Sequence, residues 1–543
     1  MQDPKEPPKS SINAPIHKFQ WLHVPGSVHQ GIEPYLGLYT YTVTPRYFDG
    51  RNSLLPMDPK LSAAVSVSVV PFVKGALQLG FTRGYTQSQA FVHRFGLKAR
   101  ISPNGKVLVF DTAQKSGTSA SGQSYTFLDE YKWLGFTARK IIFDVLDAVL
   151  ADRTLHLDLF AYDLNEPDLI EILLKLGRQK RVRIILDNAA LHHSNSTSKP
   201  KHEDEFQVMF NKASGGKPNL KRGRFGRYAH DKVFIISNKR GAIKVLTGST
   251  NFSVTGLYVN SNHVIVFDDP KVAGEYSAVF DEAWNDGVNR KAFTESELSS
   301  KTFSFSSKTV PRTEITFAPH TAGFVGTLLG GIAARIKAEG TKKENGSVFF
   351  AVMQIDKGVS PVYTALNDLH AQHKIFSYGI SDSPKGIYLY KPGSLTGLLV
   401  TGKPVNTQLP PPFNQVPNIG GVGHQIHHKF VVCGFNSDDP VVFCGSSNLA
   451  IGGEELNGDN LLEIHDNDVA TAFVIEALAL VDHFNFLDHY AKGPKGRGRL
   501  VRSVANQSHA AVSAAWFLST TDKWAQPYFD PNDLHYAARE LFG

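Results

Sequence analysis

The hydrophobic pattern of the first 110 or so residues is typical of β-strands. The stretches 35–48 (YLGLYTYTVTPRYF) and 63–73 (AAVSVSVVPFV) alternate β-branched and aromatic residues with small or polar ones, a period of two that points alternate side chains to opposite faces of a sheet. Residues up to about Ser11 carry prolines and charges without an apolar pattern. We therefore expect an N-terminal β-rich accessory domain with a disordered start over residues 1–125, ending in a Gly/Ser/Thr linker at Ser116–Ser124.

Beyond this region, the pattern of helices and strands occurs twice. An apolar strand ending in Asp occupies 154–163 (TLHLDLFAYD) in one half and 347–356 (SVFFAVMQID) in the other, and each follows a helical stretch, at 137–151 and at 324–338. The next strand ends at Asp187 in the first half and at Asp382 in the second. Strands that alternate with helices form a mixed or parallel sheet flanked by helices, so the sequence predicts an α/β fold with a duplicated core. The expected parts are a first lobe at 126–300, a second lobe at 301–495 and a C-terminal extension at 496–543.

Each half also carries the same short motif. A His-x-Lys tripeptide is followed by a hydrophobic strand, a turn, a second strand and Gly-Ser-x-Asn, and the histidine precedes the asparagine by 21 residues in both halves. The alternation of a strand places His and Lys on one face at the start of a hairpin, and the following turn returns a hydroxyl and an amide towards them. The matched residues are His230, Lys232, Ser249 and Asn251 in the first half and His427, Lys429, Ser446 and Asn448 in the second.

These residue types suit the cleavage of a phosphate diester. A diester carries a full negative charge that repels nucleophiles, and two lysines with two asparagine amides can neutralise it in the transition state. One neutral imidazole then attacks phosphorus, while the other, protonated, donates to the leaving oxygen and later activates water. The scheme needs no metal ion and no other cofactor.

The two motifs resemble those of the phospholipase D superfamily, whose hallmark is HxK(x)4D followed by GSxN. The resemblance covers roughly residues 130–495 and implies a two-lobed α/β/α core with its active site at the lobe interface. It also implies that His230 is the nucleophile, that His427 is the general acid, and that the reaction passes through a phosphohistidine. By the same resemblance Glu463, in the segment LNGDNLLEI, is the acidic residue that orients a catalytic histidine, and Val266 is its counterpart in the first half.

The chain departs from the family pattern at one position. The aspartate five residues after the motif lysine is replaced by Ser237 in the first half and by Gly434 in the second. Tyrosyl-DNA phosphodiesterases, in the same superfamily, also lack this aspartate and are active. The departure therefore separates the chain from the standard phospholipases and synthases without predicting an inactive protein.

The same residues allow two alternative interpretations. A non-catalytic nucleic-acid-binding protein on the same fold is disfavoured, because both histidines, both lysines and both asparagines are present. A zinc site at His424, His427 and His428 is also disfavoured, because zinc requires three or four convergent ligands and adjacent residues of a strand do not converge. We predict no metal site.

A basic stretch leads directly into the first motif. Between Lys212 and Lys232 there are seven basic residues and one acidic residue, interspersed with glycines, which predicts a flexible loop that suits a polyanion backbone. We therefore expect an endonuclease acting on nucleic acid, with phospholipid hydrolysis or transfer as the alternative, since an anionic headgroup attracts the same charge. A second basic run, at 492–499, extends this track or links to the C-terminal segment. The candidate substrate-binding residues are Ser249, Ser446, Lys221, Arg222, Arg224, Arg227 and Tyr228, the last stacking on bases.

Composition adds little to this picture. The net charge of +7 over 543 residues is weak evidence for an anionic partner, and the two cysteines, Cys433 and Cys444, are expected to be buried free thiols. The N-terminus lacks the apolar core of a signal peptide, and no apolar run approaches the roughly 20 residues that span a bilayer. We expect a cytoplasmic protein, monomeric because one chain holds both half-sites.

Overall fold

The computed structural model forms two compact units. It describes residues 10–13, 15–21, 23, 35–51, 53–84, 88–96, 98–103, 107–119, 122–196, 198–216, 219–342, 346–355, 359–370, 375–383, 386–391, 398–400, 425–491 and 521–543. One unit comprises Phe72–Ala491 and holds both motifs, and the other combines Met1–Pro71 with Lys492–Gly543.

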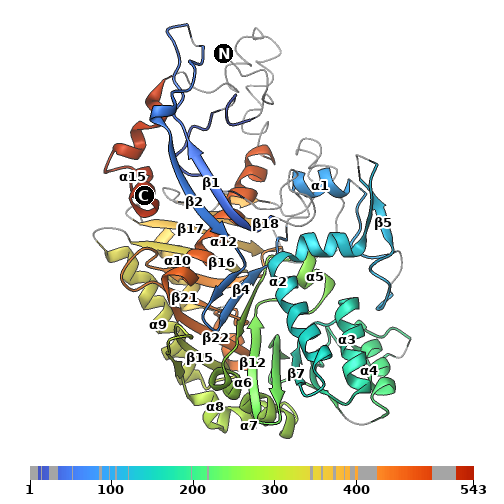
Figure 1. Cartoon of the computed structure of the whole chain (residues 1–543). Helices are drawn as coiled ribbons and strands as arrows, with labels where there is room; N and C mark the ends of the chain where they lie inside the picture. The colour runs from blue at the N-terminus through green and yellow to red at the C-terminus, as the bar shows by residue number, and fades with distance from the viewer. Residues whose placement is uncertain are drawn as a thin grey trace. The chain divides into compact units, whose positions relative to one another are not determined.

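The first lobe of the larger unit is built on an eight-stranded sheet (Figure 1). Its strands β7 and β8 are parallel, and β7, β11, β12, β13 and β4 pair successively in antiparallel fashion. In spatial order the strands are β3 (Phe72–Lys74), β4 (Leu77–Phe81), β13 (His263–Phe267), β12 (Gly241–Gly248), β11 (Val233–Asn238), β7 (His156–Ala161), β8 (Val182–Asp187) and β9 (Leu220–Gly223).

Helices cover both faces of this sheet, which explains why its central strands are almost continuously apolar. On one face, Leu157 and Leu159 of β7 belong to the core formed with α2 (Phe127–Ala151), α3 (Pro167–Arg178) and α4 (His202–Ala213). On the other face, the ring of Phe160 packs 5.1 Å from that of Phe280 in α6 (Pro270–Asn285). The remaining helices of this lobe are α1 (Gln89–Phe95), α5 (Val254–Tyr258), α7 (Arg290–Glu295) and α8 (Glu297–Ser300).

The second lobe repeats the plan. Its sheet pairs β16 with β17 in parallel and β16 with β20 in antiparallel fashion, as β7 pairs with β8 and β11 in the first lobe. The strands are, in order, β14 (Phe303–Phe305), β15 (Arg312–Ala318), β22 (Asn457–His465), β21 (Val441–Gly445), β20 (Lys429–Cys433), β16 (Ser347–Met353), β17 (Phe376–Ser383), β18 (Gly386–Tyr390) and β19 (Leu398–Val400). The helices are α9 (Ala322–Thr341), α10 (Pro361–His370), α11 (Ile451–Leu456) and α12 (Asn467–Ala491).

The duplicated α/β core predicted from the sequence is thus confirmed. The predicted strand pair 154–163 and 347–356 corresponds to β7 and β16, and the helices expected before them lie within α2 and α9. Cys433 and Cys444 are buried free thiols in neighbouring strands, as expected. Among the described residues, no helix combines the length and apolar character needed to cross a bilayer.

The lobes exchange backbone hydrogen bonds at two matched places. The short strand β10 (Tyr228–Ala229) of the first lobe pairs in parallel with β22 of the second, Ala229 opposite Gly458. An isolated parallel bridge joins Ser261 to Ile426. Each residue of the second pair lies 197 positions from its equivalent in the first, the spacing of the motif histidines, so the contact between the lobes is itself duplicated.

The N-terminal region differs from the expectation of a separate domain ending at residue 125. Strands β3 and β4 extend the first lobe's sheet, where Leu77 and Leu79 are buried and Gly80 packs so closely against α2 that a Cβ there would lie 2.9 Å from the carbonyl carbon of Thr137. The expected linker at Ser116–Ser124 contains most of the hairpin β5 (Lys115–Thr118) and β6 (Ser124–Thr126). An alternating apolar pattern predicts that a segment is a strand, but it does not predict which sheet the strand joins.

The smaller unit contains the exposed hairpin of β1 (Gly37–Val43) and β2 (Ala63–Val69). The 3-10 turn η1 (Pro59–Leu61) precedes β2. The C-terminal part has two more 3-10 turns, η3 (Asp522–Trp524) and η4 (Gln526–Phe529), and the helix α15 (Leu534–Phe542). Phe19 packs edge-on to Tyr528 at 4.8 Å, joining the N-terminal and C-terminal segments. The basic run at 492–499 lies outside the described residues.

The assignment of β4 to the first lobe can be tested with a matched pair of leucines. Leu79→Ala removes a side chain that is 2% exposed, and we expect it to lower the free energy of unfolding by about 2–5 kcal/mol. Leu38→Ala, in β1, removes one that is 65% exposed and should change stability by less than about 0.5 kcal/mol. Urea titrations followed by tryptophan fluorescence would measure both, and equal effects would contradict the assignment.

Candidate active site

The two His-x-Lys motifs lie at the start of equivalent hairpins, as predicted. His230 and Lys232 immediately precede β11, which pairs with β12, and Lys429 begins β20, which pairs with β21. All four side chains are at least nine-tenths buried. The motifs are therefore held by sheet backbone rather than by loops.

The two strand-end aspartates position these segments. Asp187 accepts hydrogen bonds from the backbone amides of Ala229 (2.7 Å) and Ala189 (2.8 Å). Asp382 accepts from the amides of Gln425 (2.5 Å) and Ile426 (3.3 Å). Ala229 and Ile426 directly precede the motif histidines, so each aspartate fixes the chain one residue before the imidazole.

Each motif histidine is oriented by a residue of the opposite lobe. The Nδ1 of His230 lies 2.6 Å from Oδ1 of Asp459, and the Nδ1 of His427 lies 2.9 Å from Oδ1 of Asn262. Asn262 donates from Nδ2 to the carbonyl of Gly256, so its Oδ1 faces His427 as an acceptor. Both imidazoles therefore donate from Nδ1, so that Nε2 is the second nitrogen of each ring, and Nε2 of His427 lies 3.2 Å from Nζ of Lys429.

The prediction that Glu463 orients a catalytic histidine is wrong. Its carboxylate accepts a hydrogen bond from His465 at 2.9 Å and is about one-third exposed. Asp459 occupies the predicted role four residues earlier, about 13 Å away along β22 at the usual strand rise. Its counterpart in the first half is Asn262, 197 positions earlier, and not Val266.

The serines of the Gly-Ser-x-Asn turns hold these partners and not a substrate, contrary to the prediction. Ser249 donates to Oδ1 of Asn262 and Ser446 donates to Oδ1 of Asp459, both at 2.8 Å. Each hydroxyl is fully buried. In contrast, Oδ1 of Asn251 and Oδ1 of Asn448 are buried without a hydrogen-bond partner among the described residues, so the two amides share the same environment.

The glycines of the turns are required by close backbone contacts. Gly248 has φ 140° and Gly445 has φ 135°, a region that side chains rarely adopt. A Cβ on Gly248 would lie 2.4 Å from the carbonyl oxygen of His263, and one on Gly445 would lie 2.4 Å from that of Asn460. The backbone of each turn can therefore follow this path only if these positions lack side chains.

The lysines concentrate positive charge at the meeting of the lobes. Lys232 donates to the carbonyl of His230, and Lys429 donates to that of His427 at 2.7 Å. Burial lowers the pKa of Lys232 to about 8, and burial together with the charge of Lys232 lowers the pKa of Lys429. The lysines of the two lobes are thus close enough to repel each other.

The same charges act on His230. Burial, then Lys232 and Lys429, hold its pKa well below the ordinary value for histidine, so the imidazole is neutral at pH 7. Burial raises the pKa of Asp459 to about 6, which leaves the carboxylate ionised at neutral pH. A neutral imidazole bound to a carboxylate is the form that can act as a nucleophile.

The predicted basic loop is largely ordered and internally bonded. Lys221 donates to the carbonyl of Trp284, and Arg222 donates to the carbonyls of Asp187 and His192. Lys221 thus holds β9 to α6, and Arg222 holds it to the end of β8. Both side chains are used in internal contacts, contrary to the prediction that they bind substrate.

The last residues of the basic stretch lie next to the first motif. Arg224 and Arg227 are exposed, and Arg227 bonds Asn457 at 2.9 Å and contributes to the lowered pKa of His230. The ring of Tyr228 lies 6.4 Å from that of His230. Sequence reasoning missed Tyr162, whose ring lies 4.6 Å from His230 and under the Lys232 ammonium at 4.7 Å.

One group of side chains carries metal-ligand atoms within 4.8 Å of one another among the described residues, namely Asp163, His192 and Glu203. His192 bonds Glu203 at 3.1 Å, and Glu203 also accepts from the amide of Leu164. The Nδ1 of His192 is thus used by Glu203, while its Nε2 is buried without a partner among the described residues, and we assign no metal to this group. In the disfavoured zinc cluster, His427 and His428 bind different residues and His424 lies outside the described residues.

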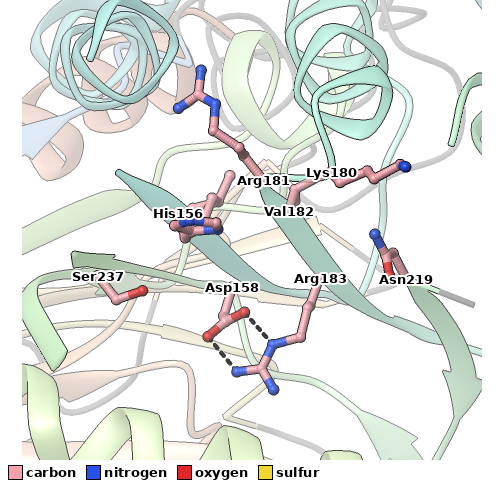
Figure 2. Close-up of a pocket in the computed structure, with 9 residues that line it drawn as sticks. His156, Asp158, Lys180, Arg181, Val182, Arg183, Asn219 and Ser237 are labelled. Atoms are coloured by element: carbon pink, nitrogen blue, oxygen red, sulfur yellow. Dashed lines mark hydrogen bonds and ion pairs between the residues drawn. The ribbon is translucent and has the colours of Figure 1, made fainter. Parts of the chain in front are cut away.

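A polar hollow of about 390 Å³ lies at the opposite ends of β7 and β8, where the strands begin (Figure 2). Its two arginines are already bonded. Arg183 forms two 2.7 Å hydrogen bonds with Asp158, and Arg181 donates to the last carbonyls of α2 and the turn that follows. These contacts are structural and do not form a second anion site.

The comparisons with known proteins agree with the motif. Residues 150–284 match the family described as cardiolipin synthase, PLD-like domain. A curated relative, mitochondrial cardiolipin hydrolase of Xenopus laevis, is 28% identical over 137 residues, which cover 25% of this chain and 57% of the relative. The match thus spans little more than half of that relative.

Solved structures show more distant similarity. The phospholipase D family member Nuc from Salmonella typhimurium aligns with 19% identity and a TM-score of 0.21, covering 26% of this chain and 87% of that chain. Yeast tyrosyl-DNA phosphodiesterase aligns with 12% identity and a TM-score of 0.30, covering 67% of this chain and 88% of that chain.

The geometry of the Gly-Ser-x-Asn turn predicts a specific cost of adding a methyl group. Gly445→Ala should lower the free energy of unfolding by about 1–3 kcal/mol, because the residue is held in a strained region against a backbone oxygen. The control is Gly274→Ala in α6, where an added Cβ meets no atom within 4 Å. This variant should have a free energy of unfolding about 0.5–1 kcal/mol higher than the wild type. Chemical denaturation of both variants checks the difference in sign.

Proposed function

We propose that this chain is a metal-independent phosphodiesterase that cleaves a diester through a phosphohistidine on His230. The observation that supports this most directly is the crossed pair of Nδ1 hydrogen bonds, His230 with Asp459 and His427 with Asn262. This arrangement fixes Nδ1 of each imidazole, so that chemistry would use Nε2, and it places two buried lysines beside the rings.

In the proposed first step, Nε2 of His230 attacks phosphorus and a P–N bond forms. The bond from phosphorus to the leaving oxygen breaks, and protonated His427 donates its proton to that oxygen. Lys232, Lys429 and the amides of Asn251 and Asn448 stabilise the charge of the non-bridging oxygens. Asp459 stabilises the positive charge that develops on the ring of His230.

In the second step a water oxygen attacks phosphorus and gives its proton to His427. The P–N bond to His230 breaks, which releases the phosphate monoester and returns both imidazoles to their starting states. The asymmetry of the partners supports this division of roles, since a carboxylate stabilises a cationic phosphohistidine and an amide does not.

Nucleic acid is the proposed substrate. Arg224 and Arg227 are exposed beside the motif, and the aromatic rings of Tyr162 and Tyr228 lie next to His230. Cationic groups along a backbone with aromatic rings for bases are typical of nucleic-acid sites. A phospholipid is the second candidate, favoured by the matched family, described as cardiolipin synthase, and by the relative named mitochondrial cardiolipin hydrolase.

The intermediate provides the central test. His230→Ala should abolish both turnover of bis-p-nitrophenyl phosphate in EDTA and formation of an acid-labile phosphoenzyme, a loss of at least about 10³-fold. His156→Ala, which removes an exposed histidine of the same lobe, should retain both. Activity that survives in His230→Ala refutes the nucleophile, and activity that disappears in EDTA refutes the metal-independent scheme.

The pKa values predict a bell-shaped dependence of kcat/KM on pH. Asp459, with a pKa of about 6, must be ionised, so activity should rise as the pH passes through about 6. Lys232, with a pKa of about 8, must be charged, so activity should fall above about 8. Asp459→Asn should lower the maximum and abolish the acid limb; an unchanged acid limb in that variant would assign it to another group.

The substrate class can be separated by salt dependence. Arg227→Ala should weaken binding of single-stranded DNA and reduce the slope of log K against log salt by about 0.7, the contribution of one phosphate contact. The control, Arg240→Ala, removes an exposed arginine at the far turn of the β11–β12 hairpin and should leave the slope unchanged. Equal slopes for both variants, together with hydrolysis of cardiolipin vesicles, would favour the phospholipid.

A further inference from the structure

A chain of buried hydrogen bonds runs from α12 of the second lobe to the partner of His427. Glu476 lies 3.1 Å from Nε2 of His428, whose Nδ1 lies 3.2 Å from Nδ1 of His263. That same Nδ1 of His263 lies 3.2 Å from the hydroxyl of Ser249. We call these four residues the histidine bridge, and its Ser249 end donates to Asn262, which holds His427.

The direction of each hydrogen bond follows from the fixed amide of Asn262. Because Oδ1 of Asn262 accepts from Ser249, the hydroxyl proton of that serine is used, and the contact with His263 requires Nδ1–H of His263 to be the donor. His263 thus donates to Ser249 and to Nδ1 of His428. His428 must then carry its proton on Nε2 and donate to Glu476.

An equivalent set of contacts on the other side of the site supports this assignment. At positions 197 residues away, Nδ2 of Asn460 donates to Oδ1 of Asp231 at 2.8 Å and to the hydroxyl of Ser446 at 3.4 Å. Asn460 takes the place of His263, and Asp231 takes the place of His428. On both sides, a side chain that follows the Gly-Ser-x-Asn turn donates to the middle residue of the other lobe's His-x-Lys motif: His263 donates to His428, and Asn460 donates to Asp231.

The surroundings keep the two imidazoles neutral. Both rings are fully buried and nearly parallel, at an interplanar angle of 2°, and Phe81, Phe430 and Phe473 pack around them. Burial and the nearby charge of Lys429 hold the pKa of each histidine well below its ordinary value. Burial raises the pKa of Glu476 to about 8, so it is largely protonated at pH 7.

We propose that His263 and His428 are positioning residues for the general acid: through Ser249 and Asn262 they hold Nδ1–H of His427 in its hydrogen bond, so that the second proton of the imidazolium, on Nε2, faces the phosphate. The proposal rests on the role of His427 in the proposed function. It also explains why the second motif has histidine between its catalytic positions, where the first has Asp231. Because the bridge joins β13 of one lobe to the residue before β20 and to α12 of the other, it acts only when the lobes are in register.

The leaving group distinguishes positioning of the acid from a general structural effect. Nitrophenolate leaves without a proton, whereas the alkoxide of a thymidine dinucleotide needs one. In single-turnover measurements, His428→Asn should slow the dinucleotide about tenfold and bis-p-nitrophenyl phosphate less than about twofold. His465→Asn, which removes a histidine bound to Asp439 and Glu463 at the edge of the same lobe, is the control and should change neither rate.

A rescue variant separates the bridge from a loss of folding. The double variant His263→Asn, His428→Asp rebuilds the pair that Asn460 and Asp231 form on the other side, and should restore the dinucleotide rate to within about twofold of wild type. Equal losses on both substrates in His428→Asn, without rescue by the double variant, would overturn the proposal.

Failure of the proposed function has a different signature. If the wild-type chain cleaves neither diester, that function fails, and the bridge is then judged by ¹⁵N chemical shifts of labelled histidine. The Nδ1 of His427 should show the shift of a protonated nitrogen in wild type and in the double variant, and an averaged shift in His428→Asn. Identical shifts in all three proteins would refute the bridge independently of activity.

Discussion

Each motif histidine takes its Nδ1 partner from the other lobe, and the rest of the site depends on this exchange. The hydrogen bonds of His230 to Asp459 and of His427 to Asn262 form only when the parallel contacts at Ala229 and Ser261 bring the lobes together. Neither lobe alone contains an oriented imidazole. The duplicated strand contacts next to the motifs thus couple assembly of the core to assembly of the site.

The sequence predicted the parts of this site that are local. The repeat, the strands β7 and β16 and the two motifs could be found because residue type and spacing within short windows determine them. The cross-lobe partners could not be found in this way, since His230 and Asp459 are 229 positions apart in the chain. The sequence did contain a signal for Asp459. The 197-residue offset between the motifs pairs Asp459 with Asn262, so both halves have a polar residue there, whereas it pairs Glu463 with the apolar Val266.

The basic stretch shows a different limit of sequence reasoning. Lys221 and Arg222 have the same side-chain chemistry as Arg224 and Arg227, yet the first two hold β9 and the last two are exposed beside the motif. Charge composition cannot separate these uses, because a guanidinium satisfies a backbone carbonyl as readily as a phosphate. The separation comes from the pairing of β9 with β8, which turns two of these side chains into internal contacts.

The two motifs are nearly identical, so any difference between their histidines must come from the residues around them. At the matched positions the pattern of donors and acceptors is kept while the charge changes. Asp459 and Asn262 both accept from an imidazole and a serine, but only Asp459 is a carboxylate. At a separation of ~5 Å and an effective dielectric constant of ~20, this charge favours a cationic ring by about 3 kcal/mol. In the proposed reaction that energy is available to a phosphohistidine on His230 and not to His427, so a single exchange of carboxylate for amide is sufficient to distinguish two otherwise equivalent imidazoles.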